Sequence, residues 1–151
     1  MYEFMMRLLA VAAVALCAVL GTVSFGGNTD MQESREFKLH PIGYVKKTSG
    51  KTLLVLDKKY QPGLLRIDKL SEIWVLWWFD RNDTPKKRAI LQVHPRGNPA
   101  NPLTGVFATH SPVRPNLIAM TRCKIIAVKE NVIEIESIDA FPDTPIIDIK
   151  S

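Results

Sequence analysis

The segment between Gly105 and Asn116 holds the side chains best suited to chemistry in this chain. It reads GVFATHSPVRPN and supplies hydroxyl groups, an imidazole, a guanidinium group and an amide. Pro112 and Pro115 fix their own φ angles and favour extended conformations at the residues before them, so Arg114 is presented at a low entropic cost. A polar loop held this stiffly favours a binding surface. A proline-rich connection between two strands would explain the same residues, and both interpretations are open at this point.

Other arrangements that carry chemistry are missing from the sequence. It has no glycine-rich phosphate loop, no paired-cysteine metal motif and no nucleophile elbow. The histidines lie far apart without an i, i+4 spacing, so no metal site is predicted at His40, His94 and His110. The two cysteines, Cys17 and Cys123, are too few for a disulfide framework. The proline-braced loop is therefore the main candidate for a functional site.

The segments that must position this loop have the pattern of short β-strands. Strands are expected at residues 38–46, 51–56, 71–79, 88–93, 120–128, 132–137 and 144–149, with one or two helical turns from Gln61. Six or seven short strands, without a helix of about ten residues after the N-terminal segment, predict a mainly β fold. The expected architecture is a small closed or nearly closed β-barrel that forms a single domain.

The most apolar of these segments is SEIWVLWWF, which begins at Ser71. It is apolar on both faces, a pattern typical of a strand that is buried on both sides. Its tryptophans, Trp74, Trp77 and Trp78, are expected to pack in the core. A stacking platform for nucleic-acid bases is the alternative interpretation.

Length and charge set wider limits. After the first thirty residues about 120 remain, which suffices for one compact domain with a single core. The formal net charge of +5 is spread along the chain, and its densest cluster is Lys86, Lys87 and Arg88. This distribution permits a polyanion partner, bound through that cluster and Arg96, without requiring one. A solvated turn is the simpler interpretation of three adjacent basic residues.

The N-terminus has the pattern of a targeting segment. Arg7 precedes an uncharged apolar run over residues 8–25, which predicts one apolar helix that acts as an export signal. The run is also just long enough for a membrane anchor, since spanning takes about 17 residues or more. We therefore expect a signal peptide or anchor at 1–27, a linker at 28–37 and the barrel at 38–151, outside the cytoplasm. If translation starts at Met31, a cytoplasmic protein is expected instead.

Four segments in the same order resemble the TsaA-like family. They are HPIGYV from His40, LSEIWVLWWF from Leu70, GVFATHSPVRPN from Gly105 and IDAFPDTPIIDIK from Ile138. The best-known members are methyltransferases that use S-adenosyl-L-methionine to modify the exocyclic amine of a hypermodified adenosine beside the tRNA anticodon. The resemblance implies a small barrel with this activity and this cofactor, with tRNA as partner, and a homodimer that holds the cofactor at the subunit junction.

The resemblance also implies the binding residues of the site; it identifies no catalytic side chain, and no metal is expected. The cofactor is expected at Asp80, Arg81, His110, Met120, Asp143, Thr144 and Pro145, and the substrate at Ser111, Arg114 and Asn116. Methyl transfer would then depend mainly on positioning.

The sequence departs from the family pattern at several of these places, among them Asp80 and Arg81, where the family has a His-rich strand end, and the PNLIAMT segment from Pro115. His110 stands where the family usually has an arginine, so an anionic group would be held less firmly. The turn from Pro142 to Pro145 lacks the family's glycine, which permits a positive φ angle. A degenerate, non-catalytic module that binds a ligand or a partner on the same barrel is therefore the alternative hypothesis.

Overall fold

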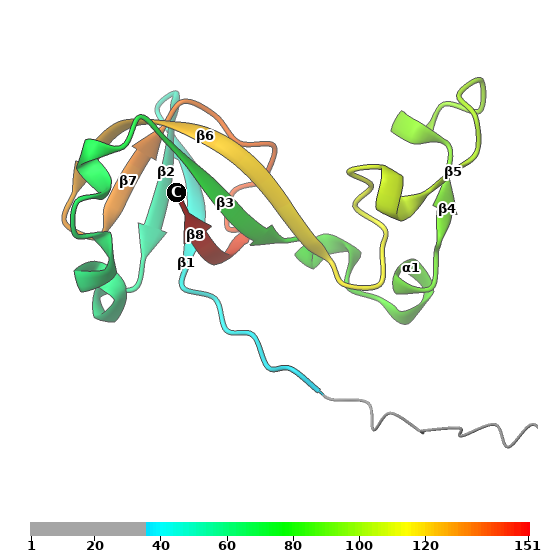
Figure 1. The fold of residues 1–151 in the computed structure, drawn as a ribbon, viewed down its shortest axis with the longest axis horizontal. Coiled ribbons are helices and arrows are strands. Elements are labelled where there is room, and N and C mark those ends of the chain that lie inside the picture. Colours follow the sequence, from blue (N-terminus) through cyan, green and yellow to red (C-terminus); the bar gives the residue numbers. More distant parts are fainter. Residues whose placement is uncertain (1–35) are drawn as a thin grey trace, which may run out of the picture. The chain divides into compact units, whose positions relative to one another are not determined.

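The computed structural model describes residues 36–151 (Figure 1). The expected N-terminal helix, its role as signal or anchor over 8–25 and nearly all of the expected linker lie outside the described residues. Residues Phe37–Ser151 form one compact unit. Within the described part of the chain, no helix is long and apolar enough to cross a membrane.

Six antiparallel strands close into a barrel in the order β1–β2–β7–β6–β3–β8. Their bounds are β1 Gly43–Thr48, β2 Lys51–Leu56, β3 Glu72–Trp78, β6 Ile118–Lys129, β7 Val132–Ile135 and β8 Pro145–Lys150. The barrel closes where β1 pairs with β8, at Gly43 opposite Ile146. The prediction of a mainly β fold with a small closed barrel is confirmed.

The close packing of β1 against β2 requires a glycine at position 43. A Cβ atom at this position would overlap the carbonyl oxygen of Val55 on the neighbouring strand. The strand was predicted to begin at Lys38, but it begins at Gly43. Pro41 has no amide hydrogen to donate to a sheet, which disfavours an earlier start. The hairpin from β1 to β2 turns through Ser49 and Gly50, both with positive φ angles, as expected for a tight turn that matches the strand twist.

The barrel interior is filled by alternate residues of the strands. On β3, Ile73, Val75 and Trp77 are buried, whereas Trp74 is 37% exposed. A barrel strand has one face toward the core and one toward solvent, so the prediction that this strand is buried on both sides is wrong. Core packing is confirmed for Trp77 and not for Trp74.

The predicted strand at residues 88–93 is also wrong. Thr84 accepts a hydrogen bond from the backbone amide of Lys87, and Pro85 occupies the first helical position, so the helix α1 forms at Pro85–Arg88. Only Gln92–Val93 is extended, as β4, and it pairs with β5 at Thr104–Gly105 in a separate two-stranded sheet. Figure 1 shows α1, β4 and β5 grouped beside the barrel between the end of β3 and the start of β6. We call residues 83–116 the arm.

Short 3-10 helices connect these elements. They lie at Lys58–Leu64, Ile67–Lys69, Asp80–Asn82, Pro95–Gly97 and Val106–Ala108. The first two contain the helical turns predicted from Gln61, and the third leads from β3 into the arm. The arm thus leaves and re-enters the barrel at one end, where the site described next is found.

Candidate functional site

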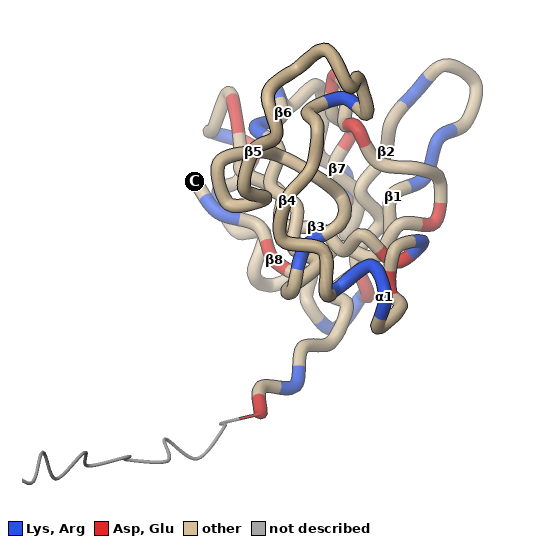
Figure 2. Tube along the Cα trace, turned by 90° about the vertical axis from the view of Figure 1, so that its right-hand side faces the viewer, with Lys and Arg blue, Asp and Glu red and all other residues tan. Residues whose placement is uncertain are grey.

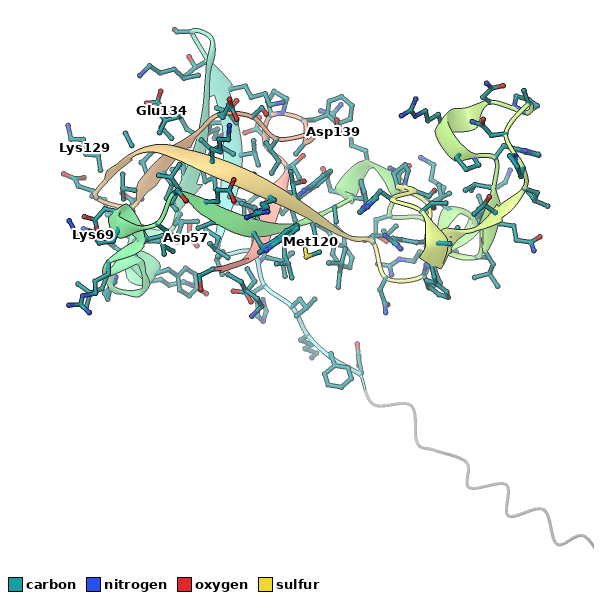
Figure 3. The ribbon with its side chains drawn as sticks, turned by 45° about the horizontal axis from the view of Figure 1, so that its top comes forward. Asp57, Lys69, Met120, Lys129, Glu134 and Asp139 are labelled. Carbon is teal, nitrogen blue, oxygen red and sulfur yellow. The ribbon has the colours of Figure 1, made fainter. Side chains whose placement is uncertain are left out.

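A pocket of about 360 Å³ lies where β3 ends and β6 begins. Three connections that are far apart in the sequence meet there: the turn after β3, the proline-braced loop and the connection that precedes β8. The pocket is lined by Trp77, Phe79, Asp80, Arg81, Asn82, His110, Pro112, Arg114, Ala119, Met120, Thr121, Asp139, Phe141 and Thr144. Figure 3 shows Met120 and Asp139 on the side of the barrel nearest the arm, with Lys69 and Lys129 at its other end. We call this cavity the barrel pocket.

Six of the ten predicted site residues line the barrel pocket: Asp80, Arg81, His110, Arg114, Met120 and Thr144. The other four are placed elsewhere. Ser111 lines a neighbouring pocket, and Pro145 lines a cavity beside residues 37–41. Asp143 is exposed and forms an ion pair with Lys46, while Asn116 lines none of these cavities. The fold therefore gathers the majority of the predicted residues and separates the remainder.

The floor of the barrel pocket is aromatic and rigid. Trp77 donates a hydrogen bond from Nε1 to Oγ1 of Thr121 over 3.0 Å. Its ring meets the ring of Phe79 edge to face, with centroids 4.7 Å apart. This arrangement satisfies the polar indole nitrogen and orients both rings, which offer apolar surface to a ligand.

The hydroxyl groups of the proline-braced loop form hydrogen bonds within the loop. Thr109 accepts a hydrogen bond from the backbone amide of Ser111, and the Ser111 hydroxyl accepts one from the amide of Val113. Arg114 donates from its guanidinium group to the carbonyl oxygen of Val106, which is fully buried. Such local bonds restrict the conformations of a loop, and they engage its hydroxyl groups within the loop rather than leaving them for a ligand.

The base of the arm is fastened by Arg88. Its Nε donates to Asp83 over 2.7 Å, and its NH1 group donates to the carbonyl oxygen of Pro115 over 2.8 Å. The indole nitrogen of Trp78 also donates to Asp83, at 3.2 Å. The hydrogen bond from Arg88 is the main reason that the pKa of Asp83 is lowered, and the same bond raises the pKa of Arg88. Arg88 therefore ties the two ends of the arm together.

This arrangement changes the interpretation of the basic cluster. Figure 2 shows Lys and Arg residues on α1 and on the hairpin between β1 and β2. On α1, Lys87 donates to the side chain of Asn82 and to the carbonyl oxygen of Arg81. Since Arg88 is engaged as well, most of the cluster supports the turn after β3. A polyanion surface made from all three residues is not favoured.

The turn before β8 keeps the geometry that a glycine would allow. Asp143 has a φ of 68°, in the left-handed region that Asp tolerates better than most residues. Its amide donates to the carbonyl oxygen of Val45, and the amide of Val45 donates to Thr144. Thr144 is 2% exposed, yet it lines the barrel pocket. The missing glycine has therefore not removed the backbone conformation.

The sequence did not indicate several residues of the barrel pocket. The main ones are Trp77, Phe79, Asn82, Thr121, Asp139 and Phe141. The sequence around Trp77 is apolar on both faces of β3, so no alternation marks Trp77 as a pocket residue. No local pattern marks Asp139 or Phe141, because their position depends on how the connection before β8 folds back.

The fold and the site together define a small β-barrel domain with a ligand-sized pocket at one end. Residues 34–151 match the family model of the tRNA-methyltransferase O N-terminal domain. The chain belongs to this family, which confirms the resemblance found in the sequence.

Archaeal relatives match most of the chain. A probable S-adenosyl-L-methionine-binding protein of Methanocaldococcus jannaschii is 47% identical over 114 residues, which cover 76% of this chain and 90% of the relative. A protein of the same description from Pyrococcus horikoshii is 43% identical over 114 residues, covering 76% of this chain and 81% of the relative.

Longer proteins match over part of their length. The tRNA (adenine(37)-N6)-methyltransferase of Rattus norvegicus is 38% identical over 90 residues, covering 60% of this chain and 20% of the relative. The crystal structure of TrmO from Pseudomonas aeruginosa superposes with a TM-score of 0.59 at 21% identity, over 78% of this chain and 55% of that chain. This chain spans about half the length of the solved protein. The superposition confirms the barrel fold. With these relatives, a non-catalytic module is not the favoured interpretation.

Proposed function

We propose that this chain binds S-adenosyl-L-methionine in the barrel pocket and transfers its methyl group to the exocyclic amine of an adenosine in tRNA. The observation that carries the proposal is the meeting of six predicted residues, from four separate parts of the sequence, around one pocket of about 360 Å³. That volume lies in the range of small-molecule sites, roughly 300 to 1,000 Å³. The names of the archaeal and mammalian relatives agree with both the ligand and the reaction.

The residues of the pocket fit the chemical groups of this cofactor. Trp77 and Met120 offer apolar surface for a purine and for the carbon chain next to the sulfur. Arg81 and Arg114 can pair with a carboxylate, and Asp80 can accept hydrogen bonds from an ammonium group. The cofactor, when bound, supplies an electrophilic methyl group on a positively charged sulfur.

The chain itself contributes position rather than a covalent intermediate. The rigid floor of Trp77 and Phe79 and the braced loop fix the walls of the pocket before a ligand arrives. Holding two reactants in line supplies a large part of the rate in such reactions. His110 stands where the family usually has an arginine. The positive charge that pairs with the carboxylate of the cofactor is therefore supplied by Arg81 and Arg114.

The proposal is tested by titrating the protein with S-adenosyl-L-methionine in a calorimeter and by following transfer of a labelled methyl group to tRNA from cells that lack this protein. We expect binding at micromolar strength and incorporation of the label into tRNA. The absence of a heat signal at high protein concentration would overturn the assignment of the cofactor. Cofactor binding without transfer to any tRNA would overturn the assignment of the reaction.

Three further expectations from the sequence stay predictions. A homodimer is checked by light scattering of the purified protein. Attachment to a membrane through residues 8–25, and a place outside the cytoplasm, are checked by fractionating cells and sequencing the N-terminal peptide. A peptide that starts at Met31 in the soluble fraction would contradict both the anchor and the export.

A further inference from the structure

A second and larger pocket adjoins the barrel pocket. It has a volume of about 1000 Å³, and its walls come from residues 90–113 of the arm together with Asp139 of the barrel. His110, Pro112 and Asp139 line both cavities. The two pockets therefore meet along one shared wall. We call the second cavity the arm pocket.

The arm pocket combines apolar walls with flat polar groups. Ile90, Val93 and Val113 supply aliphatic surface, and His94 and Arg96 add an imidazole and a guanidinium plane. The Nδ1 atom of His94 lies 2.7 Å from the carbonyl oxygen of Asn101, which only accepts, so this nitrogen donates and Nε2 is left for a ligand. Bases that leave their stack in RNA are bound by such surfaces, through stacking on imidazole or guanidinium planes.

Asp139 stands at the junction of the two pockets. It is exposed, and its carboxylate has neither a hydrogen-bond partner nor an ion-pair partner within residues 36–151. Unlike Asp83 or Asp143, it therefore has no evident structural task. A free carboxylate between a cofactor pocket and an adjoining cavity is suited to accept a proton from an amine that reacts there.

We propose that the arm pocket holds the methyl-accepting base, turned out of an RNA loop, and that Asp139 accepts the proton of its exocyclic amine. The inference rests on the function proposed above and specifies where its second substrate binds. An enzyme that acts on a base must remove the base from its stack and enclose it in a pocket, and the shared wall brings that pocket next to the reacting methyl group.

The step balances without another reagent. The amine nitrogen forms a bond to the methyl carbon while the bond from that carbon to sulfur breaks. The electron pair of the broken bond stays on sulfur, which becomes a neutral thioether. The amine loses one proton, which passes to the carboxylate of Asp139 and then to solvent.

Two pairs of variants test the proposal. Ala108→Phe adds a phenyl ring to the lining of the arm pocket, and Ala100→Phe adds the same ring to the arm at an exposed position outside the pocket. Asp139→Asn removes the carboxylate at the junction, and Glu136→Gln neutralises an exposed carboxylate nearby that pairs with Lys124 at 3.6 Å. Each protein is titrated with S-adenosyl-L-methionine and then assayed for methyl transfer to tRNA at several tRNA concentrations.

We expect Ala108→Phe and the two control variants to bind S-adenosyl-L-methionine as the unaltered protein does, which also shows that they fold. Asp139 also lines the barrel pocket, so Asp139→Asn should still bind the cofactor, and its kcat is measured at a saturating cofactor concentration. Ala108→Phe should raise the KM for tRNA at least tenfold, and Asp139→Asn should lower kcat by about 100-fold, the usual effect of losing a general base. Both control variants should keep normal kinetics. Normal transfer by Ala108→Phe and Asp139→Asn, with an active unaltered protein, would overturn the arm pocket alone. An unaltered protein without any transfer would overturn the proposed function and this inference with it.

Discussion

The guanidinium carbon of Arg81 lies 4.0 Å from the centre of the Phe141 ring. Arg81 follows β3 and Phe141 precedes β8, so this contact joins two connections that are 60 residues apart at the rim of the barrel pocket. A cation over a ring face is held by the charge distribution of the ring. The contact therefore keeps a permanent positive charge at the place where the carboxylate of the proposed cofactor would bind.

Arg81→Ala should weaken the binding of S-adenosyl-L-methionine by about 10- to 150-fold, because a hydrogen bond to a charged group contributes about 1.5 to 3 kcal/mol. Calorimetry of the purified variant measures the effect. Arg122→Ala is a matched control, since the guanidinium carbon of Arg122 lies 6.0 Å from the ring centre of Trp74, outside the pocket. Equal affinities of the two variants would show that Arg81 does not contact the cofactor.

The hydrogen bond between Arg88 and Asp83 predicts a specific dependence on pH. The pKa of Asp83 lies below its ordinary value of 3.8, chiefly because of this bond. A carboxyl group of this kind stabilises the fold above its unfolded pKa, and the contribution is lost as the pH falls through the folded pKa. Asp83→Asn should therefore lower the free energy of unfolding near neutral pH, and the difference from the unaltered protein should shrink below about pH 4. Denaturant titrations at several pH values measure this.

Asp68→Asn is the control for that experiment, since Asp68 pairs with the adjacent Lys69 in an exposed position. Exposed pairs of this type contribute about 1 kcal/mol or less. A loss of stability at Asp83 that stays constant down to strongly acidic pH would argue against the ion pair as its source.

Asp143 provides a test of backbone strain in the turn before β8. Its φ of 68° is unfavourable for a residue with a Cβ atom and costs glycine little. Both Asp143→Ala and Asp143→Gly remove the exposed ion pair with Lys46. We expect Asp143→Gly to be more stable than Asp143→Ala by about 1 kcal/mol in denaturant unfolding. If alanine were the more stable of the two, the left-handed conformation would not be the one adopted in solution.

Cys123 is expected to be inert in the folded protein. It is 2% exposed on β6, and burial raises its pKa to about 11. Because the thiolate is the reactive form, an alkylating reagent at about pH 8 should not label Cys123 until the protein is unfolded. Mass spectrometry of the Cys123 peptide before and after addition of guanidinium chloride measures the labelling. Rapid labelling under native conditions would contradict the burial of this strand.

The strand pattern of the sequence was sufficient to predict a small barrel, because an exposed and a buried face impose a period of two on each strand. It was not sufficient for the arm. The expected strand began at Arg88, but Thr84 and Pro85 start a helix that includes Arg88, and only Gln92–Val93 is extended. Local capping thus prevailed over a short apolar run.

The residues of the candidate site also divide into those that the sequence predicted and those that only the structure placed. The types of residue in the loop around Arg114, together with the family resemblance, identified six members of the barrel pocket in advance. Local sequence also determined the stiffness of this loop, through the prolines and the hydroxyl groups that bond to neighbouring amides. These properties depend on residues a few positions apart, which a sequence displays directly.

Only the tertiary structure decided which distant residues meet. Barrel closure brings Phe141 to Arg81, and the return of the arm brings Pro115 to Arg88 and His110 to the same wall as Asp139. Each of these contacts joins segments separated by more than two dozen positions, and no local period or spacing encodes it. The physical reason is that such contacts follow from the packing of the whole barrel, where one strand register places many side chains at once.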